Sequence, residues 1–317
     1  MIGTGGRGTG VLRGILQQPA AKVVALCDLK PDRLDNAATV AANDNPKTLT
    51  EWRKILDMKE VEAVFVTVPP HLHAEMSVAA LEAGKHVYCE KPIGVTAEQV
   101  QLIVNAAKKS NKVFTTGQQL RSHARLQEAV GKIHRGEVGD LLMVKAQRHA
   151  NRDHPADSSS ADWYFDVEKS GGYLIEQSVH NLDICNWVIG SRPVSAAGYG
   201  STAHYKNQPP GRNIFDNASL AYHYGNGVEM SFTQNTFHAR GMPGGGQYVH
   251  VFTSQASVDL MYATLAYPLT GEGEPRVLSP EREVDPHAHT AAFYAAIRNG
   301  GPNPADYRVG AEAALTA

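Results

Sequence analysis

The chain opens with the sequence MIGTGGRGTG (residues 1–10), and this stretch decides how the fold is interpreted. Gly3, Gly5 and Gly8 fit the pattern G-x-G-x-x-G, in which a glycine-rich turn between a strand and a helix holds the pyrophosphate of a dinucleotide. Glycine accounts for 29 of the 317 residues, so a flexible glycine-rich terminus would also explain the pattern. The sequence that follows decides between these two interpretations.

A strand and an acid follow the glycines at the distance that a dinucleotide site requires. The apolar stretch KVVALCD (22–28) predicts a buried parallel strand that ends at Asp28, 20 residues after Gly8. In dinucleotide sites an acid at this distance binds the adenosine ribose, and the helix expected over 8–18 turns its positive end toward the pyrophosphate. The cofactor-binding residues expected here are Gly3, Gly5, Gly6, Arg7, Gly8 and Asp28.

The cofactor is expected to be NAD, because the Asp28 carboxylate would repel the 2′-phosphate of NADP. Lys30 and Arg33 lie close enough in sequence to keep NADP open. Only Met1 and Ile2 precede the glycines, whereas a strand usually spans about 5–6 residues. We therefore expect the first strand of the sheet to be truncated, and the helical ending VGAEAALTA (309–317) to be clipped as well.

The remaining pattern predicts two domains of different architecture. Residues 1–119 alternate strands with helices, which predicts a Rossmann domain with a doubly wound parallel sheet that binds NAD(P). Residues 120–317 predict an α+β domain, with a helix over 172–189 and a mostly antiparallel open sheet. Asn226-Gly227 between two alternating runs indicates a hairpin turn.

Composition excludes several classes of function. The net charge of −2 gives no basis for binding nucleic acid or an anionic membrane, and no apolar run reaches the ~20 residues of a membrane helix. The three cysteines lack metal-type spacing and predict no disulfide framework. The compartment stays open: a cytoplasmic location is favoured, and a periplasmic one is compatible with a lost N-terminal signal.

Four segments together resemble the Gfo/Idh/MocA oxidoreductases, the family of glucose–fructose oxidoreductase and inositol dehydrogenase. They are GTGGRG (3–8), CD (27–28), VPPHLHAEMSVAALEAGKHVYCEKP (68–92) and GGYLIEQSVHNLDICNW (171–187). The resemblance implies NAD(P)-dependent oxidation or reduction of a sugar, cyclitol or related polyol. It also implies a homo-oligomer formed through the C-terminal sheet.

The resemblance also assigns roles to individual residues. Lys91 matches the lysine that contacts the substrate hydroxyl and the nicotinamide ribose, and His180 matches the catalytic histidine. Glu176 stands where many members carry aspartate, and Asp183 matches the second acid of that helix. Further cofactor contacts are implied for Pro69, His73 and Glu90.

The chemistry of alcohol oxidation suits these residue types. NAD takes a hydride, a base with a pKa near the working pH takes a proton, and a cation stabilises the developing alkoxide. On a regular helix Glu176, His180 and Asp183 share one face, so a carboxylate can orient the imidazole. The same trio could be an ordinary solvated face. It lacks a second histidine at metal spacing, so no metal is expected.

The loop ANRDHPADSSSADW (150–163) is a further candidate for substrate contacts, through Arg152 and Trp163, although an ordinary solvated loop fits equally well. Two other functions stay open for the whole chain. One is an NAD-dependent enzyme that cleaves glycosides through transient oxidation, which would release no net NADH. The other is a non-catalytic protein that binds a nucleotide or a sugar.

Overall fold

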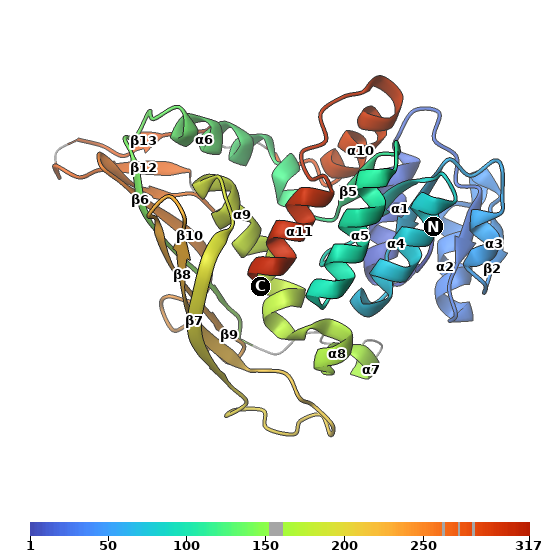
Figure 1. The fold of residues 1–317 in the computed structure, drawn as a ribbon, viewed down its shortest axis with the longest axis horizontal. Helices are drawn as coiled ribbons and strands as arrows, with labels where there is room; N and C mark the ends of the chain where they lie inside the picture. The colour runs from blue at the N-terminus through green and yellow to red at the C-terminus, as the bar shows by residue number, and fades with distance from the viewer. Residues whose placement is uncertain (152–160, 262–263, 272, 281–282) are drawn as a thin grey trace. The chain divides into compact units, whose positions relative to one another are not determined.

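The computed structural model describes residues 1–151, 161–261, 264–271, 273–280 and 283–317, which form two compact units (Figure 1). Unit 1 comprises Met1–Ser122 and Asp285–Ala314, and unit 2 comprises His123–Val284 and Leu315–Ala317. The sequence placed the boundary at residue 119 and everything after it in the second domain. The structure differs for Asp285–Ala314, because the C-terminal helices pack on the sheet of unit 1.

Unit 1 is built on a parallel sheet, as predicted. Its strands are β1 (Ala25–Cys27), β2 (Lys47–Leu49), β3 (Ala63–Val66), β4 (His86–Cys89) and β5 (Phe114–Thr116). Ile2 bridges Cys27 of β1 and Val66 of β3 in parallel fashion, which gives the order β2, β1, Ile2, β3, β4, β5. Gly3 therefore begins the glycine loop at the carboxyl edge of the sheet, where ligands bind in open α/β folds.

Helices cover both faces of this sheet, because successive strand residues point to opposite sides. The helices of unit 1 are α1 (Gly6–Leu16), α2 (Pro31–Val40), α3 (Arg53–Leu56), α4 (His73–Glu82), α5 (Ala97–Lys109), α10 (Ala288–Asn299) and α11 (Tyr307–Thr316). One apolar cluster joins the sheet to α4, α5 and α11, and the other joins it to α1, α2 and α10. The doubly wound arrangement is confirmed.

Local sequence signals account for the helix ends. The Thr96 hydroxyl accepts a hydrogen bond from the Gln99 amide at 3.3 Å and caps the N-terminus of α5. The Gln99 side chain in turn accepts from Val95 N at 2.9 Å. α10 ends at Gly300, whose φ of 63° lies in the left-handed region that favours glycine.

Unit 2 contains an eight-stranded sheet with the order β13-β12-β11-β10-β6-β9-β8-β7. The strands are β6 (Leu141–His149), β7 (Pro193–Ser201), β8 (Asn217–Tyr224), β9 (Glu229–Asn235), β10 (Gly246–Thr253), β11 (Ala256–Asp259), β12 (Leu265–Pro268) and β13 (Arg276–Val277). Among the described strands of this sheet, only β6 and β9 pair in parallel, so the expected mostly antiparallel open sheet is confirmed. The hairpin between β8 and β9 turns at Asn226-Gly227, as predicted.

The helical elements of unit 2 position its candidate residues. They are α6 (Ala124–His134), α7 (Ala161–Tyr164), α8 (Val167–Ser170), the π-helical segment η5 (Leu174–Ser178) and α9 (Val179–Ile189). α9 packs against β6 and β10 on one face of the sheet (Figure 1), where Asn181 Nδ2 donates to the Gln147 carbonyl. Across the described stretches of both units, no helix has the length and apolar character needed to cross a bilayer.

Candidate active site

The glycine loop has the geometry of a dinucleotide cradle. Gly3 has a φ of +88°, and a Cβ there would lie 2.6 Å from the Thr67 carbonyl oxygen. A Cβ on Gly8 would collide with the carbonyl oxygen of Gly3, so this glycine allows α1 to pack closely on the sheet. A Cβ on Gly5 would meet only the Arg33 side chain, at 3.3 Å, which leaves the backbone accessible to a pyrophosphate. The residues fit the cofactor that the motif predicts.

Asp28 is held at the end of β1 beside this loop. Its carboxylate accepts hydrogen bonds from Thr4 N at 2.7 Å, from Thr4 Oγ1 at 3.1 Å and from Lys30 N at 3.0 Å. These bonds fix the carboxylate next to the first turn of α1. Arg33, on the next helix, brings its guanidinium over Gly5. The Asp28 carboxylate, which is expected to bind ribose, and the Arg33 guanidinium thus both lie beside the glycine loop.

Arg7 and Glu90 are bound to each other, which the sequence did not indicate. The Glu90 side chain is buried and accepts from Arg7 Nε at 2.8 Å and from Tyr88 Oη at 3.2 Å. Burial alone would raise the pKa of Glu90. The charge and hydrogen bond of Arg7, assisted by Lys91 and His289, outweigh burial and hold this pKa below its ordinary value. Glu90 is therefore a carboxylate that anchors the first turn of α1, and its expected direct contact with the cofactor stays a prediction.

Lys91 is the second residue after β4, at the carboxyl edge of the sheet, and is joined to Pro92 by a cis peptide bond. The His73 ring contacts two carbonyl groups at this turn. Its Nδ1 lies 2.6 Å from the Pro92 carbonyl oxygen, and its Nε2 lies 2.8 Å from the Val68 carbonyl oxygen. Burial lowers the pKa of His73, so at neutral pH the neutral ring donates to one of these carbonyls. Pro69, which directly follows Val68, belongs to the same turn.

In unit 2, Glu176 lies in the π-helical segment η5 rather than in α9. The helix expected over 172–189 is present, but it is not regular, because the wider π turn moves Glu176 out of the assumed α-helical spacing relative to His180. Gln177 Nε2 donates to Glu176 Oε2, and Gln177 Oε1 accepts from Arg148 Nη2 at 2.7 Å. The sequence did not indicate Arg148 or Gln177, which lie beside the candidate acid Glu176. Arg148 lies two residues before the polar loop (150–163) that was a candidate for substrate contacts.

The other candidate residues of unit 2 differ in how deeply they are buried and in what they contact. His180 and Asp183 both lie on α9, three residues apart, with His180 half-buried and Asp183 fully buried. Trp163 packs at the edge of an aromatic cluster that contains Tyr164 and Tyr173. Arg152 lies outside the described residues. In the described stretches, no group of three or more His, Cys, Asp or Glu side chains gathers as a metal site would require.

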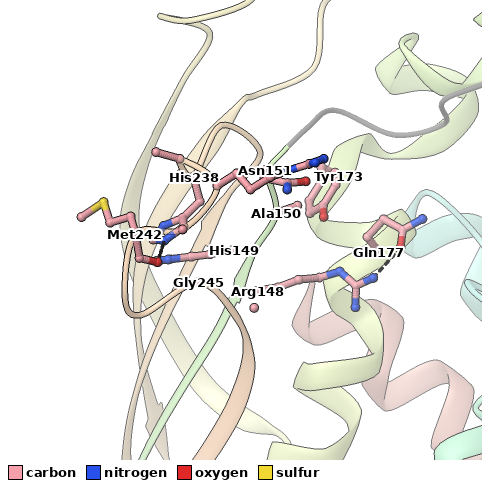
Figure 2. A pocket seen from close by; sticks show the side chains of 13 residues that line it. Arg148, His149, Ala150, Asn151, Tyr173, Gln177, His238, Met242 and Gly245 are labelled. Atoms are coloured by element: carbon pink, nitrogen blue, oxygen red, sulfur yellow. Dashed lines mark hydrogen bonds between the residues drawn. The ribbon is translucent and has the colours of Figure 1, made fainter.

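A cavity of about 410 Å³ lies in unit 2 at the end of β6 (Figure 2). Arg148, Tyr173 and Gln177 line one side of it, and His238 and Met242 lie on another. Because Gln177 also bonds Glu176, this cavity adjoins the segment that carries the candidate acid.

The glycine cradle, the acid at the end of β1 and the parallel sheet define the class of protein, a dinucleotide-binding α/β protein. A model described as "Oxidoreductase family, NAD-binding Rossmann fold" matches residues 1–118. A model of the "GFO/IDH/MocA C-terminal domain" matches residues 126–259. The chain belongs to the GFO/IDH/MocA family of oxidoreductases, and unit 1 contains its NAD-binding Rossmann fold.

Individual relatives act on sugars and polyols, according to their names. Levoglucosan dehydrogenase of Pseudarthrobacter phenanthrenivorans is 31% identical over 174 residues, which cover 54% of this chain and 43% of that protein. Inositol 2-dehydrogenase of Salmonella typhimurium is 30% identical over 191 residues, which cover 60% of this chain and 53% of that protein. The chain thus spans about half the length of these curated relatives.

The fold is shared with solved structures over nearly the whole chain. A structure of levoglucosan dehydrogenase in complex with NADH and levoglucosan matches with a TM-score of 0.84. The match covers 99% of this chain and 93% of that one at 22% sequence identity, a level at which the likeness establishes the fold alone.

Proposed function

We propose that this protein oxidises an alcohol group of a sugar, cyclitol or related polyol. NAD, when bound, supplies the hydride acceptor. Unit 1 binds the cofactor, and unit 2 supplies substrate contacts. The observation that carries the proposal is the Arg7–Glu90 pair, which ties the cofactor loop to the turn that presents Lys91. The names of the relatives, levoglucosan dehydrogenase and inositol 2-dehydrogenase, support this substrate class.

Each candidate residue has one task in this proposal. Lys91 places a positive charge at the reacting hydroxyl and stabilises the alkoxide. His180 accepts the hydroxyl proton, since the ordinary histidine pKa of about 6.5 suits a base at neutral pH. Glu176 orients and supports the charged imidazole, and Asp183, Trp163 and Arg152 contact the substrate. Asp28 binds the adenosine ribose and favours NAD, with Arg33 near enough to leave NADP open.

A screen of polyols and glycosides with NAD, followed by absorbance at 340 nm, tests the proposal. Net NADH formation with a polyol supports it. Product formation from a glycoside without net NADH would instead indicate the glycoside-cleaving alternative. Binding of NAD without turnover of any compound would indicate a non-catalytic binding protein.

We also propose that the uncovered face of the unit 2 sheet meets a second copy of the chain. On this face, Tyr199 of the edge strand β7 is 89% exposed, and Tyr267 of β12 is 44% exposed. Large apolar side chains with this exposure favour an oligomer interface. Light scattering should find an oligomer, and Tyr199→Glu should shift it toward the monomer. A monomeric wild-type protein would contradict the assembly.

A further inference from the structure

We propose that the cavity at the end of β6 binds an oxyanion, a carboxylate or a phosphate, carried by the substrate. The described residues that line it include two arginines, Arg148 and Arg240, and no acid. An excess of cationic groups in a concave site attracts anions. This inference rests on the proposed function, because it narrows the substrate to an acidic or phosphorylated sugar.

The Arg148 guanidinium donates its hydrogen bonds to uncharged amide oxygens. Its guanidinium donates to Gln177 Oε1 at 2.7 Å, to Gln247 Oε1 at 2.8 Å and to Asn181 Oδ1 at 3.4 Å. These amide oxygens orient the guanidinium, but none of them carries a negative charge to balance it. A fixed guanidinium whose hydrogen-bond partners are neutral can pair strongly with a carboxylate or phosphate.

Further polar groups lie on the same side of the cavity. Figure 2 shows Tyr173 and Asn151 close to one another, on the side of β6 where Arg148 meets Gln177. A phenol and an amide can each donate a hydrogen bond to an anion. The oxyanion is therefore expected between Arg148 and these two groups.

The cavity is linked to the candidate acid through one oriented amide. Because a guanidinium only donates, Gln177 must turn its oxygen toward Arg148 and its nitrogen toward Glu176. Only the Gln177 side chain would thus separate an anion bound at Arg148 from Glu176. One sugar could therefore place its anionic group at Arg148 and another of its groups near Glu176. This link favours a substrate subsite over an unrelated surface site.

A glycine-rich loop within residues 238–246 lines the other side of the cavity. Gly241, Gly244 and Gly246 have φ values of 86°, 83° and 85°, which other residues rarely adopt. His238 lies 5.6 Å from His149, ring centre to ring centre, and a Cβ on Gly245 would meet its ring at 2.8 Å. Short loops of this kind expose backbone amides that can bind oxyanions. Arg240 is exposed on the same loop.

Calorimetric titration of the full chain with saturating NADH, which cannot accept a hydride from the sugar, tests the proposal without turnover. The probes are D-glucuronate for a carboxylate, D-glucose 6-phosphate for a phosphate and D-glucose as the neutral control. At least one anion should bind about tenfold more tightly than glucose, the effect of one charge-assisted hydrogen bond. The preferred anion identifies the group, and its affinity should fall as salt is added.

Three variants locate the anion. Arg148→Gln should bind the preferred anion no more tightly than it binds glucose. Arg240→Gln should bind the anion only a few-fold more weakly than the wild type does, because the exposed charge of Arg240 is screened. Arg192→Gln, an exposed arginine of unit 2 outside the cavity, should change nothing. If Arg148→Gln does not fold, Arg240→Gln still provides the test, because its exposed side chain can be replaced at little structural cost.

Two results would overturn the inference: anions that bind no better than glucose, or equal losses in the cavity variants and in Arg192→Gln. The proposed function would survive either result if a neutral polyol yields NADH. It would fail separately if no compound yields NADH even though the anions bind at the cavity.

Discussion

Arg7 and Glu90 join the two motifs that identify this protein: Arg7 Nε lies 2.8 Å and Nη2 lies 2.7 Å from the same carboxylate oxygen of Glu90. Arg7 belongs to the first turn of α1, behind the glycine loop, and Glu90 directly precedes Lys91. The pair couples the position of the cofactor loop to the turn that carries the proposed catalytic lysine. Its removal should therefore affect both stability and NAD binding.

Glu90→Gln should lower the free energy of unfolding at pH 7 by about 1.5–3 kcal/mol, the usual effect of a hydrogen bond to a charged group. The pKa of Glu90 is lowered in the folded state, so its ionisation stabilises the fold above the unfolded value of about 4.5. That stability is lost as the pH falls through the folded pKa. Urea unfolding at pH 7 and below pH 4.5 should show a deficit that shrinks in acid. An equal deficit at both pH values, or the same behaviour in the exposed control Glu62→Gln, would contradict the role of the pair.

Gly8→Ala should weaken NAD binding at least tenfold and lower the free energy of unfolding by about 1–3 kcal/mol, because the added methyl group collides with Gly3. Gly10→Ala is the matched control on the same helix, since no atom lies within 4 Å of its added Cβ. That variant should be more stable by about 0.5–1 kcal/mol and bind NAD normally. Thermal unfolding and NAD titration check both variants. Similar effects at the two positions would show that close packing at Gly8 does not matter.

Asp28→Ser should reduce the preference for NAD over NADP by about tenfold or more, because a carboxylate facing the 2′-phosphate is removed. NAD affinity should also fall, since Asp28 anchors Thr4 beside the glycine loop. Fluorescence titration with both cofactors measures the change, and Asp32→Ser on the exposed start of α2 is the control. A wild-type preference for NADP would contradict the assignment of Asp28 to the ribose.

The glycine loop and Asp28 could be predicted from the sequence because their signals are local. Gly3 and Gly8 are required by backbone geometry that any reader of the motif can anticipate, and Asp28 ends an apolar strand at a fixed spacing. Thr96 and Asn226-Gly227 likewise act over a few residues. Such local rules predicted the parallel sheet and the hairpin, and both were confirmed.

The remaining features depend on contacts between distant residues. No local pattern marks Arg7 as the partner of Glu90, 83 residues away, or returns α10 and α11 to unit 1. The π turn that carries Glu176 looks like ordinary helix in sequence, because apolar periodicity does not resolve one extra residue per turn.

Lys91→Ala should reduce turnover of the polyol found in the screen by about 10²–10³-fold, the usual effect of removing one group that stabilises an oxyanion. NAD affinity should change only modestly. Because Lys91 and His180 are proposed to act on one charge-and-proton event, the double variant should lose less than the product of the two single losses. Steady-state rates of the three variants test this. Fully multiplicative losses would indicate that the two residues act in separate steps.

The central claim is that His180 accepts the proton of the oxidised hydroxyl, and the most direct test is the initial rate of NADH formation by His180→Ala at saturating NAD and polyol. The account predicts a loss of about 10²–10⁴-fold, with NAD affinity unchanged. The control variant His223→Ala, an exposed histidine of unit 2 bound to Glu229, should retain the wild-type rate. A His180→Ala rate within a few-fold of wild type would contradict the claim and make His180 a structural residue.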